Sequence, residues 1–274
     1  MVPPPHSTGI SAERCKEIYA RRPPEIEGSI NEKEARFLHA LLLGKAPARC
    51  AEIGTCSGLS TAVMADALVL LNQEDGGNRR AISYDLLDHL YFDATRKVGF
   101  FLDSMPEPVR AAAELRTGCT ALQLKEDFSE AALDFLMVDA NHAHPWPCLD
   151  LLVALPLLAR NVVICLHDIN LPLNNPKHQV FGAKLAFDAL PLEKQYCEPI
   201  KGRVPNMGAV ELADQRDAVR DALSECVQTH PWETIVDKDW LRQAGLLEEF
   251  HASHRANTTR LRPGLLRRLF TNTR

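Results

Sequence analysis

Apolar residues fall along this chain in short compact runs that alternate with longer amphipathic stretches. Compact runs predict buried strands, whereas apolar residues that recur every three or four positions predict helices. Leu59, Val63, Met64 and Leu68 show the second pattern, because they fall on one face of a helix expected over 58–71. Strands are expected at residues 49–54, 81–85, 114–117, 133–139 and 161–166. This alternation is typical of an α/β fold.

The remaining patterns complete a doubly wound, mostly parallel, seven-stranded sheet. Two late strands, at 196–200 and 207–212, are expected to add an antiparallel edge, and residues 1–10 are expected to be disordered. Further helices are expected at residues 11–21, 29–43, 87–102, 147–158, 179–190, 214–228 and 237–250. The predicted organisation is an N-terminal helical extension (1–45), a core (46–214), and C-terminal helices with a basic tail (215–274).

A glycine turn joins the first predicted strand to its helix. Gly54 and Gly58 form a G-x-x-x-G pattern, with Glu52 two residues before the first glycine. Such a turn cradles a ligand at the carboxyl edge of the sheet, and glycine lets a ligand approach the backbone. Dinucleotide sites favour G-x-G-x-x-G. The carboxylate favours a cationic ligand over a pyrophosphate, although a tight turn of any α/β protein has the same appearance.

Polar residues follow the predicted strands at the points where the strands end. Taken singly, each has a structural explanation: Asp85 as a helix cap, His142 as a loop histidine and Asp168 as a turn former. Ligands bind at the carboxyl ends of strands in open α/β sheets, so five such strand ends predict one site. The residues concerned are Glu52, Gly54, Asp85, Gly118, Cys119, Asp139, His142, His167 and Asp168.

Composition narrows the class of protein. The 274 residues are 46% hydrophobic and 24% charged, which fits one large globular α/β domain. The net charge of −5 argues against general nucleic-acid binding. The chain lacks both the roughly 20-residue apolar stretch of a membrane span and an apolar signal core. The eight cysteines form no C-x-x-C pair, so we interpret them as reduced thiols of a cytoplasmic protein.

Two segments resemble the class I S-adenosylmethionine-dependent methyltransferases. Residues 49–61 resemble their first motif. The run over 134–168, D-F-L-M-V-D-A-N-H, then a helix, then V-V-I-C-L-H-D, is similar to the small-molecule O-methyltransferases, including the catechol, caffeoyl-CoA and macrolide-sugar enzymes. The resemblance covers residues 26–212. It implies a Rossmann-like fold and methyl transfer from S-adenosyl-L-methionine to a hydroxyl of a natural-product, sugar or catechol-like acceptor.

The same resemblance implies a role for each matching residue. Asp85 accepts hydrogen bonds from the ribose, and Asp139 lies beside the sulfonium. His142 matches the catalytic lysine of the catechol enzymes and is the candidate general base, since an unperturbed histidine titrates near ~6.5. The implied cofactor-binding residues are Glu52, Gly54, Thr55, Gly58, Ser60, Asp85, Gly118, Cys119 and Asp139.

A Mg²⁺ ion held by Asp139 and Asp168 is also implied, but the ligand set is incomplete. The catechol-type enzymes have an asparagine directly after the second aspartate, whereas this chain has Ile169 there. Two carboxylates would leave the ion held mostly by water and substrate oxygens. His167 prefers softer metals, and a buried core histidine is an equally good interpretation. His144 is expected to be a surface loop residue.

Several alternatives stay open at this point. They are an N-methyltransferase, a catalytically silent S-adenosylmethionine-binding or scaffold protein, and an NAD-dependent dehydrogenase, which the missing G-x-G-x-x-G disfavours. Residues 251–274 carry six Arg and no acid or Lys. This tail is interpreted either as a basic segment that docks on a partner subunit of a homodimer or on an anionic surface, or as a solvated extension.

Overall fold

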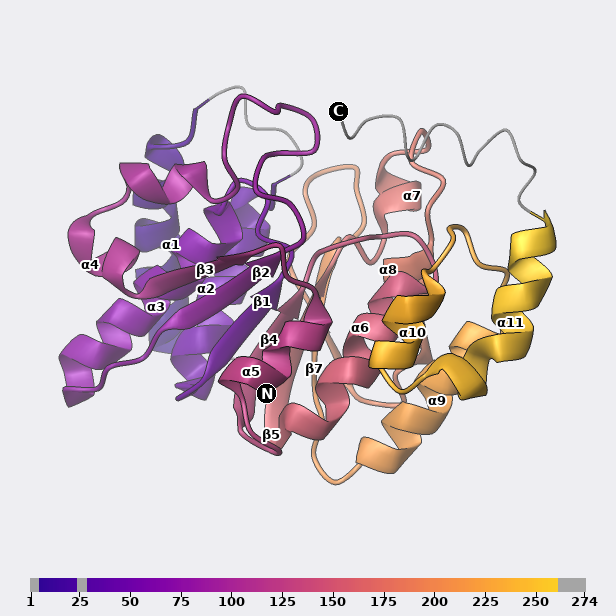
Figure 1. The fold of residues 1–274 in the computed structure, drawn as a ribbon. Helices are drawn as coiled ribbons and strands as arrows, with labels where there is room; N and C mark the ends of the chain where they lie inside the picture. The colour runs from indigo at the N-terminus through magenta and orange to yellow at the C-terminus, as the bar shows by residue number, and fades with distance from the viewer. Residues whose placement is uncertain (1–4, 24–28, 261–274) are drawn as a thin grey trace.

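The computed structural model describes residues 5–23 and 29–260, and its centre is one mixed sheet (Figure 1). The strands are β1 (Cys50–Ile53), β2 (Ala81–Asp85), β3 (Ala113–Thr117), β4 (Leu133–Val138), β5 (Leu158–His167), β6 (Lys194–Tyr196) and β7 (Met207–Glu211). Their order across the sheet is β3-β2-β1-β4-β5-β7-β6. Strands β1 to β5 are parallel, and β7 pairs antiparallel with β5 and β6. The order reverses between β1 and β4, where doubly wound sheets bind their ligands.

Helices cover both faces of the sheet (Figure 1). One face carries α1 (Pro5–Ala20), α2 (Glu32–Lys45), α3 (Leu59–Asp75) and α4 (Glu107–Ala111). The other carries α5 (Leu124–Asp127), α6 (Trp146–Ala154), α8 (Gly182–Ala189), α9 (Arg216–Thr229), α10 (Lys238–Gln243) and α11 (Leu247–Arg260). The short helix α7 (Leu171–Asn174) follows β5. No helix in the described ranges is long and apolar enough to cross a membrane.

The sheet separates two hydrophobic cores because side chains alternate along each strand. Phe135 and Met137 of β4 pack into the core under α1, α2 and α3. Leu136 and Val138 of the same strand pack into the core under α6, α8 and α9. Burial on both faces explains why the central strands are continuous apolar runs in the sequence. The predicted seven-stranded, mostly parallel fold with an antiparallel edge is confirmed.

Asn31 caps helix α2, as its position in the sequence suggested. Its side chain accepts hydrogen bonds from the backbone N–H groups of Lys33 and Glu34, and the Glu34 carboxylate accepts one from the Asn31 N–H. This reciprocal pair is a capping box. The cap fixes the position of Glu34, which matters for the site described below.

The prediction of a helix over residues 87–102 is wrong. This segment is a loop with an isolated bridge between His89 and Lys97, followed by a 3₁₀ turn at Phe100–Ser104. Aspartate side chains cause the difference, because they accept hydrogen bonds from nearby backbone N–H groups that a helix would need. Asp85 accepts from Leu87 N, and Asp93 accepts from Thr95 N.

Both ends of the chain also depart from expectation. Residues 5–10, expected to be disordered, are the first turns of α1, where Pro5 is tolerated because the first helical N–H needs no partner. The helix expected over 237–250 is divided at Gly245, which has φ +72°, and α11 continues to Arg260. Residues 261–274, which carry most of the predicted basic tail, lie outside the described residues, so the dimer stays a prediction.

Candidate active site

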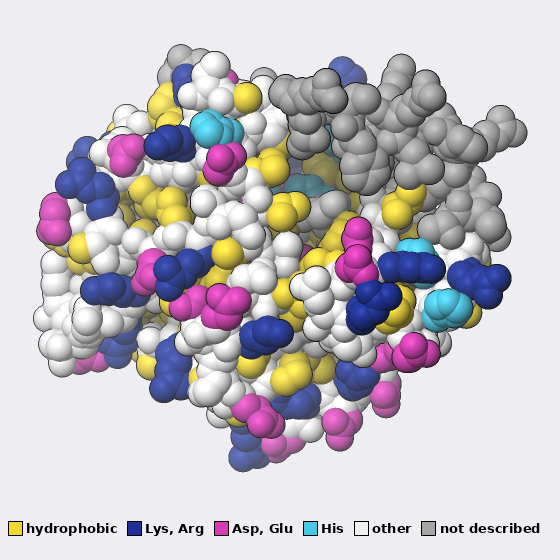
Figure 2. All heavy atoms as spheres, in the orientation of Figure 1, with side chains coloured by type: hydrophobic (Ala, Val, Ile, Leu, Met, Phe, Trp, Pro, Cys, Tyr) yellow, Lys and Arg dark blue, Asp and Glu magenta, His cyan; other side chains and the backbone are white. Residues whose placement is uncertain are grey.

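An open cavity of about 1170 Å³ lies at the carboxyl ends of the parallel strands. Figure 2 shows the surface hollowed on this face, with hydrophobic side chains around the hollow. Gly54, Asp85, Cys119 and Asp139 line the cavity, each at or just after the end of a different strand. The structure therefore brings the predicted strand-end residues together.

The turn after β1 brings the backbone of two strands into close approach. Gly54 has φ +99°, and a Cβ placed on it would lie 2.2 Å from the carbonyl oxygen of Asp139. Its N–H donates to Tyr84 O over 2.8 Å, and the N–H of Asp139 donates to Ile53 O over 2.8 Å. Glycine is required here for its positive φ and for lack of space.

Asp85 holds this turn from the end of β2. Its Oδ2 accepts hydrogen bonds from the backbone N–H groups of Thr55 and Cys56, at 3.1 and 3.0 Å, and its Oδ1 accepts from Leu87 N. The carboxylate is half-buried and lies on the cavity wall. It can accept further hydrogen bonds there, because a carboxylate has about four acceptor positions.

Several predicted cofactor residues lie beneath the cavity wall. The Glu52 carboxylate is fully buried and accepts hydrogen bonds from Ser83 and Thr61 at 2.6 and 2.5 Å. Burial raises its pKa to about 7, against the lowering effect of hydroxyls that include Ser60. The predicted residues absent from the described wall of the cavity are Glu52, Thr55, Gly58, Ser60 and Gly118.

His142 is held between two carboxylates. Its Nε2 lies 3.3 Å from Asp139 Oδ1, and its Nδ1 lies 3.2 Å from Asp168 Oδ2. All three side chains line the cavity, and the exposed fraction of the imidazole is 29%. The imidazole can therefore both contact a bound molecule and exchange a proton with it.

A second histidine lies behind the first. The Nδ1 of His167 lies 2.9 Å from Asp139 Oδ1, and its Nε2 lies 3.3 Å from Glu34 Oε2. Only 6% of the His167 side chain is exposed. The expectation of a buried, hydrogen-bonded histidine at this position is confirmed, and both ring nitrogens have carboxylate partners.

The charges of this cluster stabilise each other. Burial lowers the pKa values of His142 and His167, but the neighbouring carboxylates outweigh it and raise both above the usual histidine value. Burial raises the pKa of Asp139, but the two histidines outweigh it and bring that pKa down to about 2. The carboxylates therefore favour the charged form of each imidazole, and the imidazoles favour ionised Asp139.

Asp168 has a backbone conformation that side-chain contacts hold in place. Its φ is +57°, which is uncommon for a residue other than glycine. The amide of Asn206 donates to Asp168 Oδ1 over 2.5 Å, and the N–H of Ile169 donates to Asn206 O. Strained residues of this kind cluster at functional sites.

Glu34, Asp150 and Asn206 belong to the cavity wall although sequence analysis did not single them out. In the sequence, Glu34 has only the appearance of a residue that caps a helix. Asn206 precedes an antiparallel strand, whose amino end lies at the edge where parallel strands finish. Only Asp150 could have been noticed in the sequence, because it is an acidic residue within an otherwise apolar helix. Burial raises the pKa of the Asp150 carboxyl to about 7.

The loop after β4 leads into α6 through His144 and Trp146, whose side chains lie in different surroundings. His144, expected at the surface, is fully buried, because the loop packs against the segment after α9 and the His144 N–H donates to Glu233 over 2.7 Å. Trp146 packs edge-on against Trp240 with ring centroids 5.0 Å apart, while also lining the cavity.

Residues 51–169 match a family of methyltransferase domains. The match runs from β1 to the residue after Asp168, so it includes the glycine turn and the His142 cluster. The resemblance to a methyltransferase domain is thereby confirmed over this segment. A comparison with curated proteins gave no match.

Among solved structures, the chain is similar to several methyltransferases. An O-methyltransferase from Bacillus cereus in complex with SAH is 19% identical, covers 77% of this chain and 93% of its own, and has a TM-score of 0.47. An O-methyltransferase from Streptomyces achromogenes involved in tomaymycin synthesis, in complex with SAM, is 19% identical, with 75% and 89% coverage and a TM-score of 0.46. An SAH-bound methyltransferase from Podospora anserina is 14% identical, with 77% and 89% coverage and a TM-score of 0.48.

Proposed function

We propose that this chain transfers the methyl group of S-adenosyl-L-methionine to a hydroxyl of a small molecule. The observation that carries the proposal is the placement of His142, between Asp139 and Asp168, on the wall of the strand-end cavity of a methyltransferase domain. A histidine in contact with bound molecules can accept a hydroxyl proton. An N-methyltransferase needs such a base less, because an amine can attack in its neutral form.

The cofactor binds across the reversal point of the sheet in this proposal. Gly54 leaves room for the ligand against the backbone of the turn, and Asp85 accepts hydrogen bonds from the ribose hydroxyls. Cys119 borders the adenine, and Asp139 faces the positive sulfonium. S-adenosylmethionine supplies an activated methyl group, so the protein mainly positions and deprotonates the acceptor.

His142 must lose a proton before it can act as a base. Its two carboxylate neighbours raise its pKa and so favour the charged form. A second positive charge beside Asp139, such as a sulfonium, would compete for that carboxylate and favour the neutral imidazole. Neutral His142 then accepts the hydroxyl proton, and Asp168 holds the resulting imidazolium in place.

The donor set at the same place fits a divalent metal. Ligand atoms of Asp139, His142 and Asp168 all lie within 4.8 Å of one another. Asn206 contacts Asp168 through its amide nitrogen, and its Oδ1 accepts a hydrogen bond from Asn170 N, so the amide would have to turn over to offer a third side-chain oxygen. Carboxylate and amide oxygens are typical Mg²⁺ ligands. A bound Mg²⁺ would lower the pKa of the acceptor hydroxyl. Asp139, Asp168 and Asn206 would hold it, and His142 would have to move aside.

Ligand-dependent thermal unfolding tests this proposal. S-adenosylhomocysteine should raise the melting temperature of the purified chain, whereas NAD should not, because only a ligand of the folded state stabilises it. Methyl transfer from labelled S-adenosylmethionine to a panel of catechols, sugars and amines should then favour hydroxyl acceptors. Binding without transfer to any acceptor would favour a silent binding protein, and stabilisation by NAD alone would favour a dehydrogenase.

A further inference from the structure

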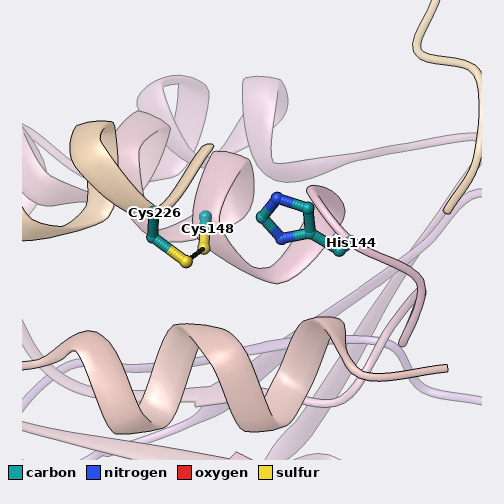
Figure 3. A group of neighbouring side chains, drawn as sticks. All are labelled: His144, Cys148 and Cys226. Carbon is teal, nitrogen blue, oxygen red and sulfur yellow. Dashed lines mark hydrogen bonds between the residues drawn. The ribbon is translucent and has the colours of Figure 1, made fainter. Parts of the chain in front are cut away.

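His144, Cys148 and Cys226 form a second cluster, separate from the cavity wall. His144 lies in the loop before α6, Cys148 in α6 and Cys226 in α9, and Figure 3 shows the two sulfur atoms facing each other beside the His144 ring. All three residues are buried, and their ligand atoms lie within 4.8 Å of one another. Two chain segments about 80 residues apart thus converge on one point.

The histidine of this cluster is buried without hydrogen-bond partners for its ring among the described residues. This is true of both ring nitrogens of His144. Leaving a buried polar group without a partner costs free energy, so such groups in native proteins generally bind something.

The distance between the two thiols suits a metal better than a disulfide. The sulfur atoms are 3.7 Å apart. Two thiolates on a tetrahedral Zn²⁺, with Zn–S bonds of about 2.3 Å, lie about 3.8 Å apart, whereas a disulfide requires about 2.05 Å. The two sulfur atoms could thus bind one ion at nearly their present separation, with a His144 nitrogen within 4.8 Å of both.

A fourth donor stands beside the cluster. The His230 ring lies 5.9 Å from the His144 ring, centroid to centroid. The sequence repeats one spacing in opposite order, His144-x₃-Cys148 and Cys226-x₃-His230. His144 precedes α6, and His230 is the residue that directly follows α9. His230 is exposed, so an ion can reach the buried donors from this side.

We propose that His144, Cys148, Cys226 and His230 form a structural site for Zn²⁺. Two thiolates and two imidazoles are a typical tetrahedral zinc set. The ion would join α9 to the loop that carries His142, and would add to the existing tie between His144 and Glu233. Its binding would release the thiol protons of Cys148 and Cys226. This site is independent of methyl transfer.

Metal titration of the reduced full chain tests the site. After chelator treatment, one equivalent of Zn²⁺ should bind, and an excess of about 100-fold over Kd should raise the melting temperature by about 5 °C or more, while Mg²⁺ should not reproduce this shift. Co²⁺ in place of Zn²⁺ should give intense visible bands and a sulfur-to-metal charge-transfer band, which the oxygen-rich Asp139 site cannot give.

A matched pair of variants locates the ion. Cys226→Ser should abolish the cobalt charge-transfer band or weaken Zn²⁺ binding at least tenfold. Cys165→Ser removes an equally buried thiol outside the cluster and should leave Zn²⁺ binding unchanged. Alkylation of unmodified chain, mapped by mass spectrometry, gives a readout that does not depend on either variant folding: Zn²⁺ should protect Cys148 and Cys226 together.

Three results would overturn the proposal. They are a reduced chain that binds no Zn²⁺, a Cys226→Ser variant that binds it as tightly as the unmodified chain, and unchanged alkylation of both thiols in the presence of Zn²⁺. A native Cys148–Cys226 disulfide, detected as a loss of two hydrogens in the non-reduced peptide, would overturn it as well.

Discussion

The side-chain amide of Asn206 lies 2.5 Å from Oδ1 of Asp168, although the two residues are 38 positions apart in the sequence. The contact exists because β7 runs antiparallel to β5, which brings the residue before β7 to the end of β5. The amide nitrogen faces Asp168, and the Asn206 oxygen, which accepts a hydrogen bond from Asn170 N, would become a possible metal ligand if the amide turned over.

Replacing Asn206 would distinguish a metal-dependent mechanism from a metal-free one. Asn206→Asp adds a third carboxylate, so in a metal-free site the repulsion should lower turnover. In a Mg²⁺ site the same change should tighten metal binding. We expect weak Mg²⁺ binding that Asn206→Asp strengthens, measured as the Mg²⁺ concentration for half-maximal rate after chelator treatment. Full activity in chelator would remove the metal from the mechanism.

His142→Ala should lower turnover by about 10²-fold while leaving cofactor affinity nearly unchanged, because a general base contributes about that factor. The pKa of His142 is raised, so turnover of the unmodified chain should be low at acidic pH and rise as pH increases through that pKa. In the His142→Ala variant, this rise of turnover with pH should be absent. His178→Ala, at another residue on the cavity wall, is the control. An unchanged pH profile would assign the base elsewhere.

Asp85→Asn should weaken S-adenosylmethionine binding, because the ribose loses charge-assisted hydrogen bonds worth roughly 1.5–3 kcal/mol each. That corresponds to about 10- to 100-fold in Kd, measurable by calorimetry. Asp88→Asn, three residues later on an exposed side chain, should leave the affinity unchanged. Equal affinities of the two variants would exclude Asp85 from the cofactor site.

Gly54→Ala should destabilise the chain and abolish cofactor binding. The new methyl group would lie 2.2 Å from the carbonyl oxygen of Asp139, so β1 and β4 would have to separate. Gly76→Ala isolates the effect of positive φ, since Gly76 has φ +71° and open space around it. The control should cost about 1 kcal/mol of unfolding free energy. A Gly54 variant no less stable than this control would contradict the clash.

Asp66 links α3 to α1 and α2. Its ionisation should make the free energy of unfolding depend on pH in the acidic range. Burial raises its pKa, but hydrogen bonds with His39 and Arg14 outweigh it and lower the pKa below the usual value. The contribution of ionised Asp66 to the free energy of unfolding is therefore complete above the pKa of the unfolded state, ~3.9. It is lost as pH falls through the pKa of the folded state.

Denaturant unfolding checks this expectation. At pH 7 Asp66→Asn should cost roughly 3 kcal/mol, because it leaves buried partners unpaired. The cost should shrink towards pH 3. Asp75→Asn breaks a comparable contact with Arg79 at the surface, and should change stability little at either pH. A pH-independent cost for Asp66→Asn would disprove the linkage.

Sequence reasoning succeeded where a local pattern decides the structure. The strand of Leu133–Val138 is a continuous apolar run because both its faces are buried, and Asn31 reads as a cap because its side chain bonds two residues onward. These patterns depend on neighbours in the chain, so the sheet and its ligand edge were predictable.

Contacts between distant segments were not predictable in this way. Leu90, Val98 and Phe101 have spacings compatible with a helix and are buried, yet aspartate-capped turns prevail between them. His144 is buried through a contact with Glu233, 89 residues away. The resemblance predicted His142 as a site residue, but nothing in the sequence showed that two carboxylates would raise its pKa.

The reversed direction of β7 has a consequence for engineering. Within the loop that joins β6 to β7, the exposed residues 198–204 reach the rim of the cavity from the sheet edge remote from Asp85, whereas Cys197 is buried in the core and Asn206 contacts Asp168. The length and side chains of this exposed segment can therefore be exchanged as a module, for example by grafting or randomisation, without altering the glycine turn after β1. Libraries confined to this segment offer a route to new acceptors with the cofactor half kept constant.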